Sequence, residues 1–119
     1  MVIKVAVHNQ DEQGNIYTLL EDVTVIWNGR VLYIPAGFKS DGASVPRFFW
    51  RSVFPPGDSR VLRAAIAHDF IYREHPEGWT RKEADELFYD LLREDGVSWF
   101  SAQSAYWGVR IFGVASWKK

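Results

Sequence analysis

The chain has 119 residues, the length of one ordinary domain, and 47% of them are hydrophobic while 24% are charged. This globular composition excludes disorder, collagen-like sequence and low complexity. The six Trp, eight Phe and five Tyr can fill a substantial core. The chain has no cysteine, which excludes disulfides, thiolate nucleophiles and cysteine-type zinc sites. Its net charge of −1 provides no basic excess, so we expect no specific binding of nucleic acid.

The sequence shows neither a recognisable export signal nor a membrane-spanning segment. Residues 1–11 form a short alternating stretch without the apolar core of a signal peptide. No apolar run approaches the roughly 20 residues that a transmembrane helix requires. We therefore expect a protein that is not secreted through a recognisable signal and carries no transmembrane segment.

The first third of the chain predicts strands, because it is rich in β-branched residues and alternates apolar with polar side chains. Asn28-Gly29 is typical of a two-residue hairpin turn, since both turn positions favour positive φ. Pro35 ends the returning strand. In chain order we expect a strand at 2–7, a polar turn at 9–15, strand character over 16–27, the hairpin turn, and a strand at 30–34.

The rest of the chain predicts three helices, at about 59–73, 81–94 and 98–112. Each boundary carries a capping residue or a glycine. The residues expected to begin and end the helices are, in chain order, Asp58 or Ser59, the capping box Thr80–Glu83, Gly96, Ser98 and Gly113.

Together these elements predict an α+β fold, in which a small N-terminal antiparallel sheet of hairpins is followed by about three helices. We expect a single domain over residues 1–119. Strands occupy 1–35, a loop and a short helix occupy 36–57, and helices occupy 58–113.

The first predicted helix is apolar on nearly all sides, so we expect it to be central, yet it contains His68 and Asp69. His68 shares one stripe with Ala65 and Tyr72. A buried imidazole needs partners for its two nitrogens, and a buried carboxylate needs a cation or several donors. Both residues are therefore candidates for a polar site inside the helical core.

The second helix contains one acid on its apolar stripe, Asp85, while its other charged residues can occupy the outer face. Two helices joined by a short connection usually pack antiparallel. Asp85 follows His68 by 17 residues, which fits half a helix out, a turn, and one turn back. We therefore expect a hydrogen bond between the two side chains.

This pair has two interpretations. A carboxylate on one imidazole nitrogen fixes the tautomer and leaves the other nitrogen to take a proton from water, so His68 and Asp85 can form a catalytic dyad. Asp69, about 100° further around the helix, would then face a different space and can hold a hard cation. Alternatively, His68 and Asp85 only satisfy each other and Asp69 caps a loop. Arg81, one turn before Asp85, is a rival partner for its carboxylate.

The segment after the sheet adds a third polar element. Gly37 and Gly42 permit unusual φ values, so the backbone can turn carbonyl or N–H groups toward a ligand. Asp41 and Ser44 add oxygen ligands or hydrogen-bond donors. The alternative is an ordinary connection in which Ser44 caps a short helix at 46–53.

These motifs, in this order, resemble a phage and prophage family known as domain-of-unknown-function family 1353. They are Gly37-Phe38, the run Asp41-Gly42-Ala43-Ser44-Val45-Pro46, His68-Asp69 with Tyr72-Arg73, and Arg81 with Ala84-Asp85. The resemblance extends from about Tyr33 to Gly113 and Trp117. It implies a phage or prophage protein of the virion or the host cytoplasm, and it implies no activity.

A second resemblance covers only the two central helices. His68-Asp69-Phe70 with Tyr72-Arg73 looks like the His-Asp helix of bacterial and fungal secreted phospholipases A2. This resemblance implies that His68 is a general base toward water and that Asp85 orients it. It also implies that Asp69 binds Ca²⁺ with backbone carbonyls of the Gly37–Ser44 loop, and that the substrate is a lipid or another ester. The Asp41 carboxylate can add a further oxygen ligand to this site. Those enzymes are secreted and braced by disulfides, whereas this chain has no cysteine, and its loop departs from theirs.

Two classes of function follow from these residues. In the first, the protein is a hydrolase that uses the His68–Asp85 dyad. In the second, it is a non-enzymatic virion, assembly or host-interaction protein whose polar residues hold the helices together, and aromatic residues such as Trp79 and Trp117 contact a phage or host protein. Solvent access distinguishes them, because a catalytic His68 must open into a cleft beside Asp69.

Overall fold

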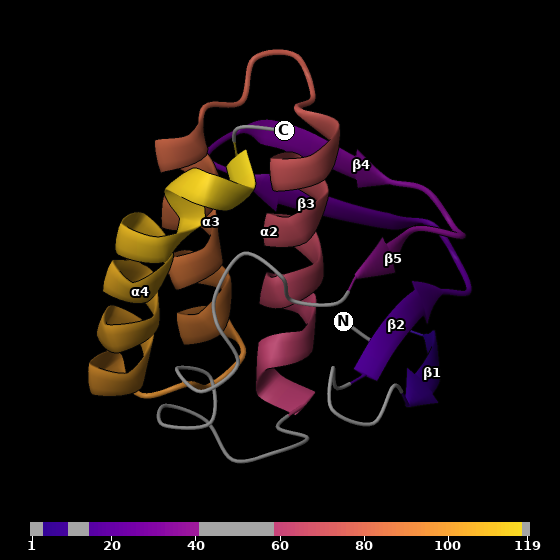
Figure 1. The fold of residues 1–119 in the computed structure, drawn as a ribbon, viewed down its shortest axis with the longest axis horizontal. Helices are drawn as coiled ribbons and strands as arrows, with labels where there is room; N and C mark the ends of the chain where they lie inside the picture. Colours follow the sequence, from indigo (N-terminus) through magenta and orange to yellow (C-terminus); the bar gives the residue numbers. More distant parts are fainter. Residues whose placement is uncertain (1–3, 10–14, 41–58, 118–119) are drawn as a thin grey trace. The chain divides into compact units, whose positions relative to one another are not determined.

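The structure is a computed structural model that describes residues 4–9, 15–40 and 59–117 (Figure 1). The chain forms two compact units, Met1–Asp41 and Gly42–Lys119. The described part of the first unit holds all the strands, and the described part of the second holds the helices. Strands followed by three α-helices confirm the predicted α+β class. None of the described helices combines the length and the apolar character that a membrane crossing requires.

The first unit contains two antiparallel sheets. One has three strands in the order β1-β2-β5, and the other is the hairpin of β3 and β4. The strands are β1 (Val5–Asn9), β2 (Asn15–Leu19), β3 (Val23–Trp27), β4 (Arg30–Ile34) and β5 (Lys39–Ser40).

The β3–β4 hairpin confirms the predicted turn. Asn28 and Gly29 adopt φ values of 50° and 75°, and Trp27 pairs with Arg30 across them. One face of the hairpin is buried and the other is exposed, with Ile26 72% exposed, as the alternation predicts. The buried side chains are Val23, Val25, Leu32 and Ile34.

The strand pattern departs from the prediction between Leu19 and Val23 and again after Pro35. The predicted strand character of 16–27 is interrupted there, because the chain bends away at Leu20. The end of β2 instead pairs with the returning chain: the Leu19 N–H donates to the Phe38 carbonyl at 2.9 Å. The returning segment continues as β5, inside the region expected to be a loop.

The helical unit begins with a 3₁₀ turn, Ser59–Val61, and continues through α2 (Leu62–Glu74), α3 (Arg81–Glu94) and α4 (Trp99–Trp117). The helix α2 packs against α3, and α3 packs against α4 (Figure 1). The short connection between α2 and α3 makes these two helices antiparallel, as expected.

The capping residues confirm three of the predicted boundaries. The Glu83 N–H donates to Thr80 Oγ1 at 3.1 Å, and the Thr80 N–H donates to Glu83 Oε1 at 3.0 Å, which completes the capping box of α3. Gly96 ends that helix with φ 99°. The Ser101 N–H donates to Ser98 Oγ at 3.3 Å, so Ser98 begins α4.

The prediction that Gly113 ends the last helix was wrong. The helix α4 continues through Gly113 to Trp117, four residues further. Gly113 is buried, and a Cβ atom built on it would lie 2.5 Å from the Tyr72 hydroxyl oxygen. The glycine therefore allows α4 to approach α2 closely.

The start of the first helix also differs from the prediction. The α-helical hydrogen bonding begins at Leu62, three residues later than expected, because the first turn is 3₁₀. Val61 occupies the N-cap position without a side-chain cap. The alternative cap, Asp58, lies outside the described residues.

Gly113→Ala should destabilise the protein. Alanine gains about 1 kcal/mol of helix propensity over glycine, but its Cβ collides with a phenol that is held by buried partners, and overpacking costs about 1–3 kcal/mol. Because that Cβ would lie only 2.5 Å from the hydroxyl oxygen, we expect the upper part of this range and therefore a net loss of about 1–2 kcal/mol in urea denaturation. The loss should shrink in a Tyr72→Phe background, where the closest atom is gone. A Gly113→Ala protein as stable as the unmodified one would contradict this account of the glycine.

Candidate functional site

Asp85 lies on the buried face of α3, and its side chain is fully buried. It shares this face with Ala84, Leu87, Phe88, Leu91 and Leu92. The other acids of α3, Glu83, Glu86, Asp90 and Glu94, are partly or fully exposed. A lone carboxylate among apolar side chains needs several donors, and the neighbouring helices supply them.

The helix α2 supplies two donors to the same carboxylate oxygen. His68 Nε2 lies 2.7 Å from Asp85 Oδ1, and the Tyr72 hydroxyl donates to Oδ1 at 2.6 Å. His68 and Tyr72 are one helical turn apart, so both face α3. The predicted hydrogen bond between His68 and Asp85 is confirmed.

Two arginines approach the same group. Arg110 Nη1, from α4, donates to Asp85 Oδ2 at 2.8 Å. Arg81 Nη1 lies 3.6 Å from Oδ2 and donates, at 3.3 Å each, to the Tyr72 hydroxyl and to the backbone carbonyls of Val109 and Arg110. Arg81 is therefore not the main partner of Asp85. We refer to His68, Tyr72, Asp85 and Arg110 as the Asp85 cluster.

The cluster keeps Asp85 ionised. Burial alone would raise the pKa of this carboxyl, but its interactions with His68, Tyr72 and Arg110 outweigh burial, and the net pKa is lowered. Burial and the bond to the carboxylate raise the pKa of the Tyr72 phenol. At neutral pH Tyr72 is therefore a neutral donor to a carboxylate anion.

The imidazole of His68 is packed between aromatic rings. Its centroid lies 4.2 Å from that of Tyr72 and 4.9 Å from that of Phe88, and the residue is 2% exposed. Because Asp85 is an acceptor, a neutral His68 carries its proton on Nε2 and donates it to Oδ1. Nδ1 is then the basic nitrogen.

The proposed metal ligands are only partly described. Asp69 is buried on α2, next to His68. Gly37 has φ 92° and is exposed in the first unit. Asp41, Gly42 and Ser44 lie outside the described residues, so the predicted approach of this loop to Asp69 stays a prediction. Within the described ranges, no three His, Asp or Glu side chains gather as a metal site.

Sequence reasoning missed Arg110. The sequence does contain a signal, since Arg110 is the only charged residue of the Trp99–Trp117 stretch. A single charge on an otherwise uncharged helix indicates a specific partner. The helix is apolar on several sides, however, so periodicity did not show which side faced Asp85.

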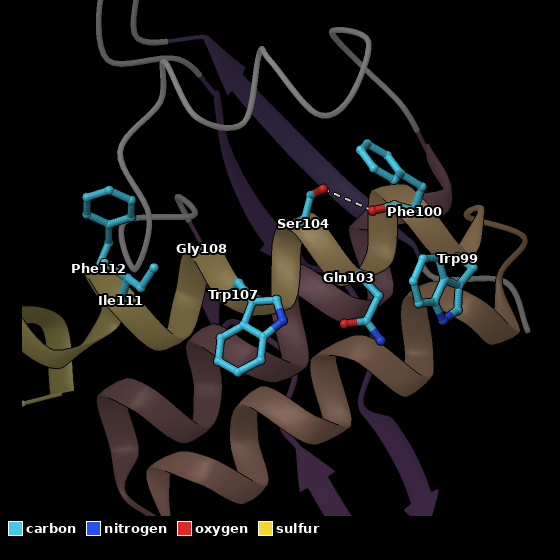
Figure 2. Close-up of a pocket in the computed structure, with 8 residues that line it drawn as sticks. All are labelled: Trp99, Phe100, Gln103, Ser104, Trp107, Gly108, Ile111 and Phe112. Atoms are coloured by element: carbon cyan, nitrogen blue, oxygen red, sulfur yellow. Dashed lines mark hydrogen bonds between the residues drawn. The ribbon is translucent and has the colours of Figure 1, made fainter.

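The exposed apolar surface also lies elsewhere than expected. Trp79 and Trp117 are half-buried, and Trp117 packs edge-on against Tyr72 and stacks on His75 with centroids 4.0 Å apart. A groove instead follows α4, where Trp107 is 57% and Phe100 74% exposed (Figure 2). The residues that line it are Trp99, Phe100, Gln103, Ser104, Trp107, Gly108, Ile111 and Phe112. This groove contains no member of the Asp85 cluster.

Comparison with known proteins identifies the family. The model of the family described as "Protein of unknown function (DUF1353)" matches residues 17–109, and the chain belongs to this family. Two relatives come from Sinorhizobium fredii (strain NBRC 101917 / NGR234). The chain is 31% identical to "Uncharacterized protein y4jT" over 86 residues, which are 72% of this chain and 25% of that protein. It is 33% identical to "Uncharacterized protein y4iH" over 75 residues, 63% of this chain and 30% of that protein. The chain thus spans less than a third of either relative, and no solved structure matches.

Asp85→Asn should destabilise the protein by about 3 kcal/mol, because it leaves Arg110 without a buried counter-charge. Asp90→Asn, an exposed acid of the same helix, should change stability by less than about 0.5 kcal/mol. Urea denaturation of both variants measures the difference.

The difference in stability between the unmodified protein and Asp85→Asn should depend on pH. The folded pKa of Asp85 lies below its ordinary value of 3.8, so its contribution to stability is present above that value and is lost as the pH falls through the folded pKa. The unmodified protein should therefore lose stability below about pH 4 more steeply than Asp85→Asn. Parallel curves would contradict the ionised state of Asp85.

Proposed function

We propose that this chain forms the catalytic part of an ester hydrolase, in which His68 is the general base and Asp85 orients it. The observation that carries the proposal is the 2.7 Å contact between His68 Nε2 and Asp85 Oδ1, made by a carboxylate that the cluster keeps ionised. The pair occupies facing turns of two antiparallel helices, so its geometry is fixed by the packing of the core. Lipid esters are the proposed substrate class, from the resemblance of the His-Asp helix to that of secreted phospholipases A2.

The chemistry follows from the tautomer. With Nε2–H held by Asp85, Nδ1 takes a proton from water as the water oxygen attacks the ester carbonyl. The new C–O bond gives a tetrahedral intermediate, and Asp85 stabilises the imidazolium that has formed. His68 then returns the proton to the leaving alkoxide oxygen as the ester C–O bond breaks. Water and ester are consumed, and an acid and an alcohol are released.

Calcium is the cofactor that the same resemblance implies. Among the described residues, the resemblance assigns this ion to Asp69, a buried carboxylate of the kind of oxygen ligand that Ca²⁺ prefers. Asp41, the further ligand expected from the sequence, lies outside the described residues. When bound, Ca²⁺ supplies positive charge for the developing oxyanion.

A second candidate function is supported by the burial of the cluster. His68 is 2% exposed and Asp85 is fully buried, and the three donors of Asp85 tie α2, α3 and α4 together. The cluster would then be structural, in a non-enzymatic virion, assembly or host-interaction protein of phage origin. The exposed apolar surface of α4 would contact the partner.

His68→Gln separates the two candidates. Glutamine keeps a donor for Asp85 but cannot act as a base, so ester hydrolysis should fall by at least about 100-fold. His75→Gln is the matched control, because His75 is an exposed histidine at the end of the same helix and should leave the rate unchanged. Turnover is measured on a p-nitrophenyl ester and on phosphatidylcholine vesicles, with circular dichroism to establish folding. No turnover by the unmodified protein on either substrate, with and without Ca²⁺, favours the second candidate.

Calcium binding is tested by isothermal titration calorimetry. The unmodified protein should release or take up heat on addition of Ca²⁺. Asp69→Asn should weaken binding, because asparagine lacks the negative charge of the carboxylate. Asp90→Asn, an exposed acid on α3, should bind as the unmodified protein does. The absence of any binding heat in the unmodified protein would contradict the calcium site.

A further inference from the structure

Arg110 brings the only charge of α4 to the buried carboxylate of α3. Its Nη1 atom lies 2.8 Å from Asp85 Oδ2, and its side chain is 25% exposed. No other residue of Trp99–Trp117 is charged. Partly burying a guanidinium on an otherwise uncharged helix costs free energy unless the guanidinium has a specific hydrogen-bond acceptor. For Arg110 that acceptor is Asp85.

Both oxygens of the Asp85 carboxylate accept hydrogen bonds. His68 and Tyr72 bond to Oδ1, at 2.7 and 2.6 Å, while Arg110 bonds to Oδ2. The terminal torsion of an aspartate is broad, so a carboxylate held at one oxygen can swing about its Cβ–Cγ bond. A donor at the second oxygen fixes the plane.

Arg81 has a different role. Its Nη1 is 3.6 Å from Oδ2, and its three hydrogen bonds go to the Tyr72 hydroxyl and to two backbone carbonyls of α4. Arg81 therefore joins α3 to the backbone of α4, and the side chain of Arg110 holds the carboxylate.

We propose that Arg110 is a positioning residue for His68. Its guanidinium fixes the plane of the Asp85 carboxylate, so Oδ1 stays on Nε2 and the imidazole keeps the tautomer in which Nδ1 is basic. The effect on the tautomer depends only on the geometry of the cluster. Its kinetic consequence rests on the proposed hydrolase function.

The tautomer is read at fixed neutral pH by nitrogen-15 NMR of the full chain. In the unmodified protein, the His68 Nε2–H proton should give a sharp resonance that exchanges slowly with water. In Arg110→Gln the exchange should become about tenfold faster or more, and signals of both tautomers should be present. Arg63→Gln is the matched control. Arg63 makes two 2.9 Å bonds to Asp95 in the same unit, so its loss lowers stability but should leave the His68 signal unchanged.

If Arg110→Gln does not fold, Arg110→Lys provides the second test of this proposal. An ammonium on a shorter stem lacks the planar fork of arginine, so we expect an exchange rate between those of the unmodified protein and the glutamine variant. Exchange as slow as in the unmodified protein, in either folded variant, overturns the proposal.

The kinetic measurement separates this proposal from the proposed function. In Arg110→Gln, kcat should fall by about 10-fold to 100-fold with KM unchanged, since orientation and not binding is lost. Arg63→Gln should keep kcat. If the unmodified protein hydrolyses no ester, the hydrolase proposal fails, while the NMR measurement still decides the role of Arg110.

Discussion

One ionised carboxylate in an apolar interior determines how the three helices are arranged. An unpaired charge at Asp85 would cost several kcal/mol, so each neighbouring helix must place a donor on it. The helix α2 contributes His68 and Tyr72, and α4 contributes Arg110. A shift of one residue in any helix would rotate its donor by about 100° and leave the carboxylate unpaired. The hydrogen bonds of the cluster can therefore form at only one rotation of each helix.

The close approach of α4 to α2 occurs at a residue that bonds to this carboxylate. The Tyr72 hydroxyl donates to Asp85, and a Cβ on Gly113 would lie 2.5 Å from that hydroxyl oxygen, so the glycine leaves room for it. Arg81 then bonds to the Tyr72 hydroxyl and to the α4 backbone at Val109, which holds this approach in place. The packing around the buried charge of Asp85 therefore involves Gly113, Tyr72, Arg81 and Arg110.

The sequence predicted what depends on local chemistry. The Asn28-Gly29 turn, the Thr80 capping box and the inward acid at Asp85 each carry a signal within a few residues, and the structure confirms them. Features that depend on distant partners were missed or mistaken. The strand β5 exists because the chain returns to β2, Gly113 does not end its helix because it faces Tyr72, and the acceptor of Arg110 lies 25 residues away. The catalytic and metal roles remain predictions, since no local pattern reports what a side chain binds.

The composition of the cluster bears on the choice between its two candidate roles. Tyr72 and Arg110 already place a donor on each oxygen of Asp85, and an amide could supply a third donor as well as an imidazole does. The contribution of His68 to holding the helices together is therefore one that a neutral amide could also make. The Nε2 atom of His68 lies 2.7 Å from a carboxylate that stays ionised, an arrangement that a general base requires and that a contact between two helices can equally use. Solvent access to the second ring nitrogen distinguishes the two roles, because a catalytic His68 must open into a cleft. At 2% exposure His68 is buried, which is the state that the structural role requires and from which hydrolysis would need the site to open.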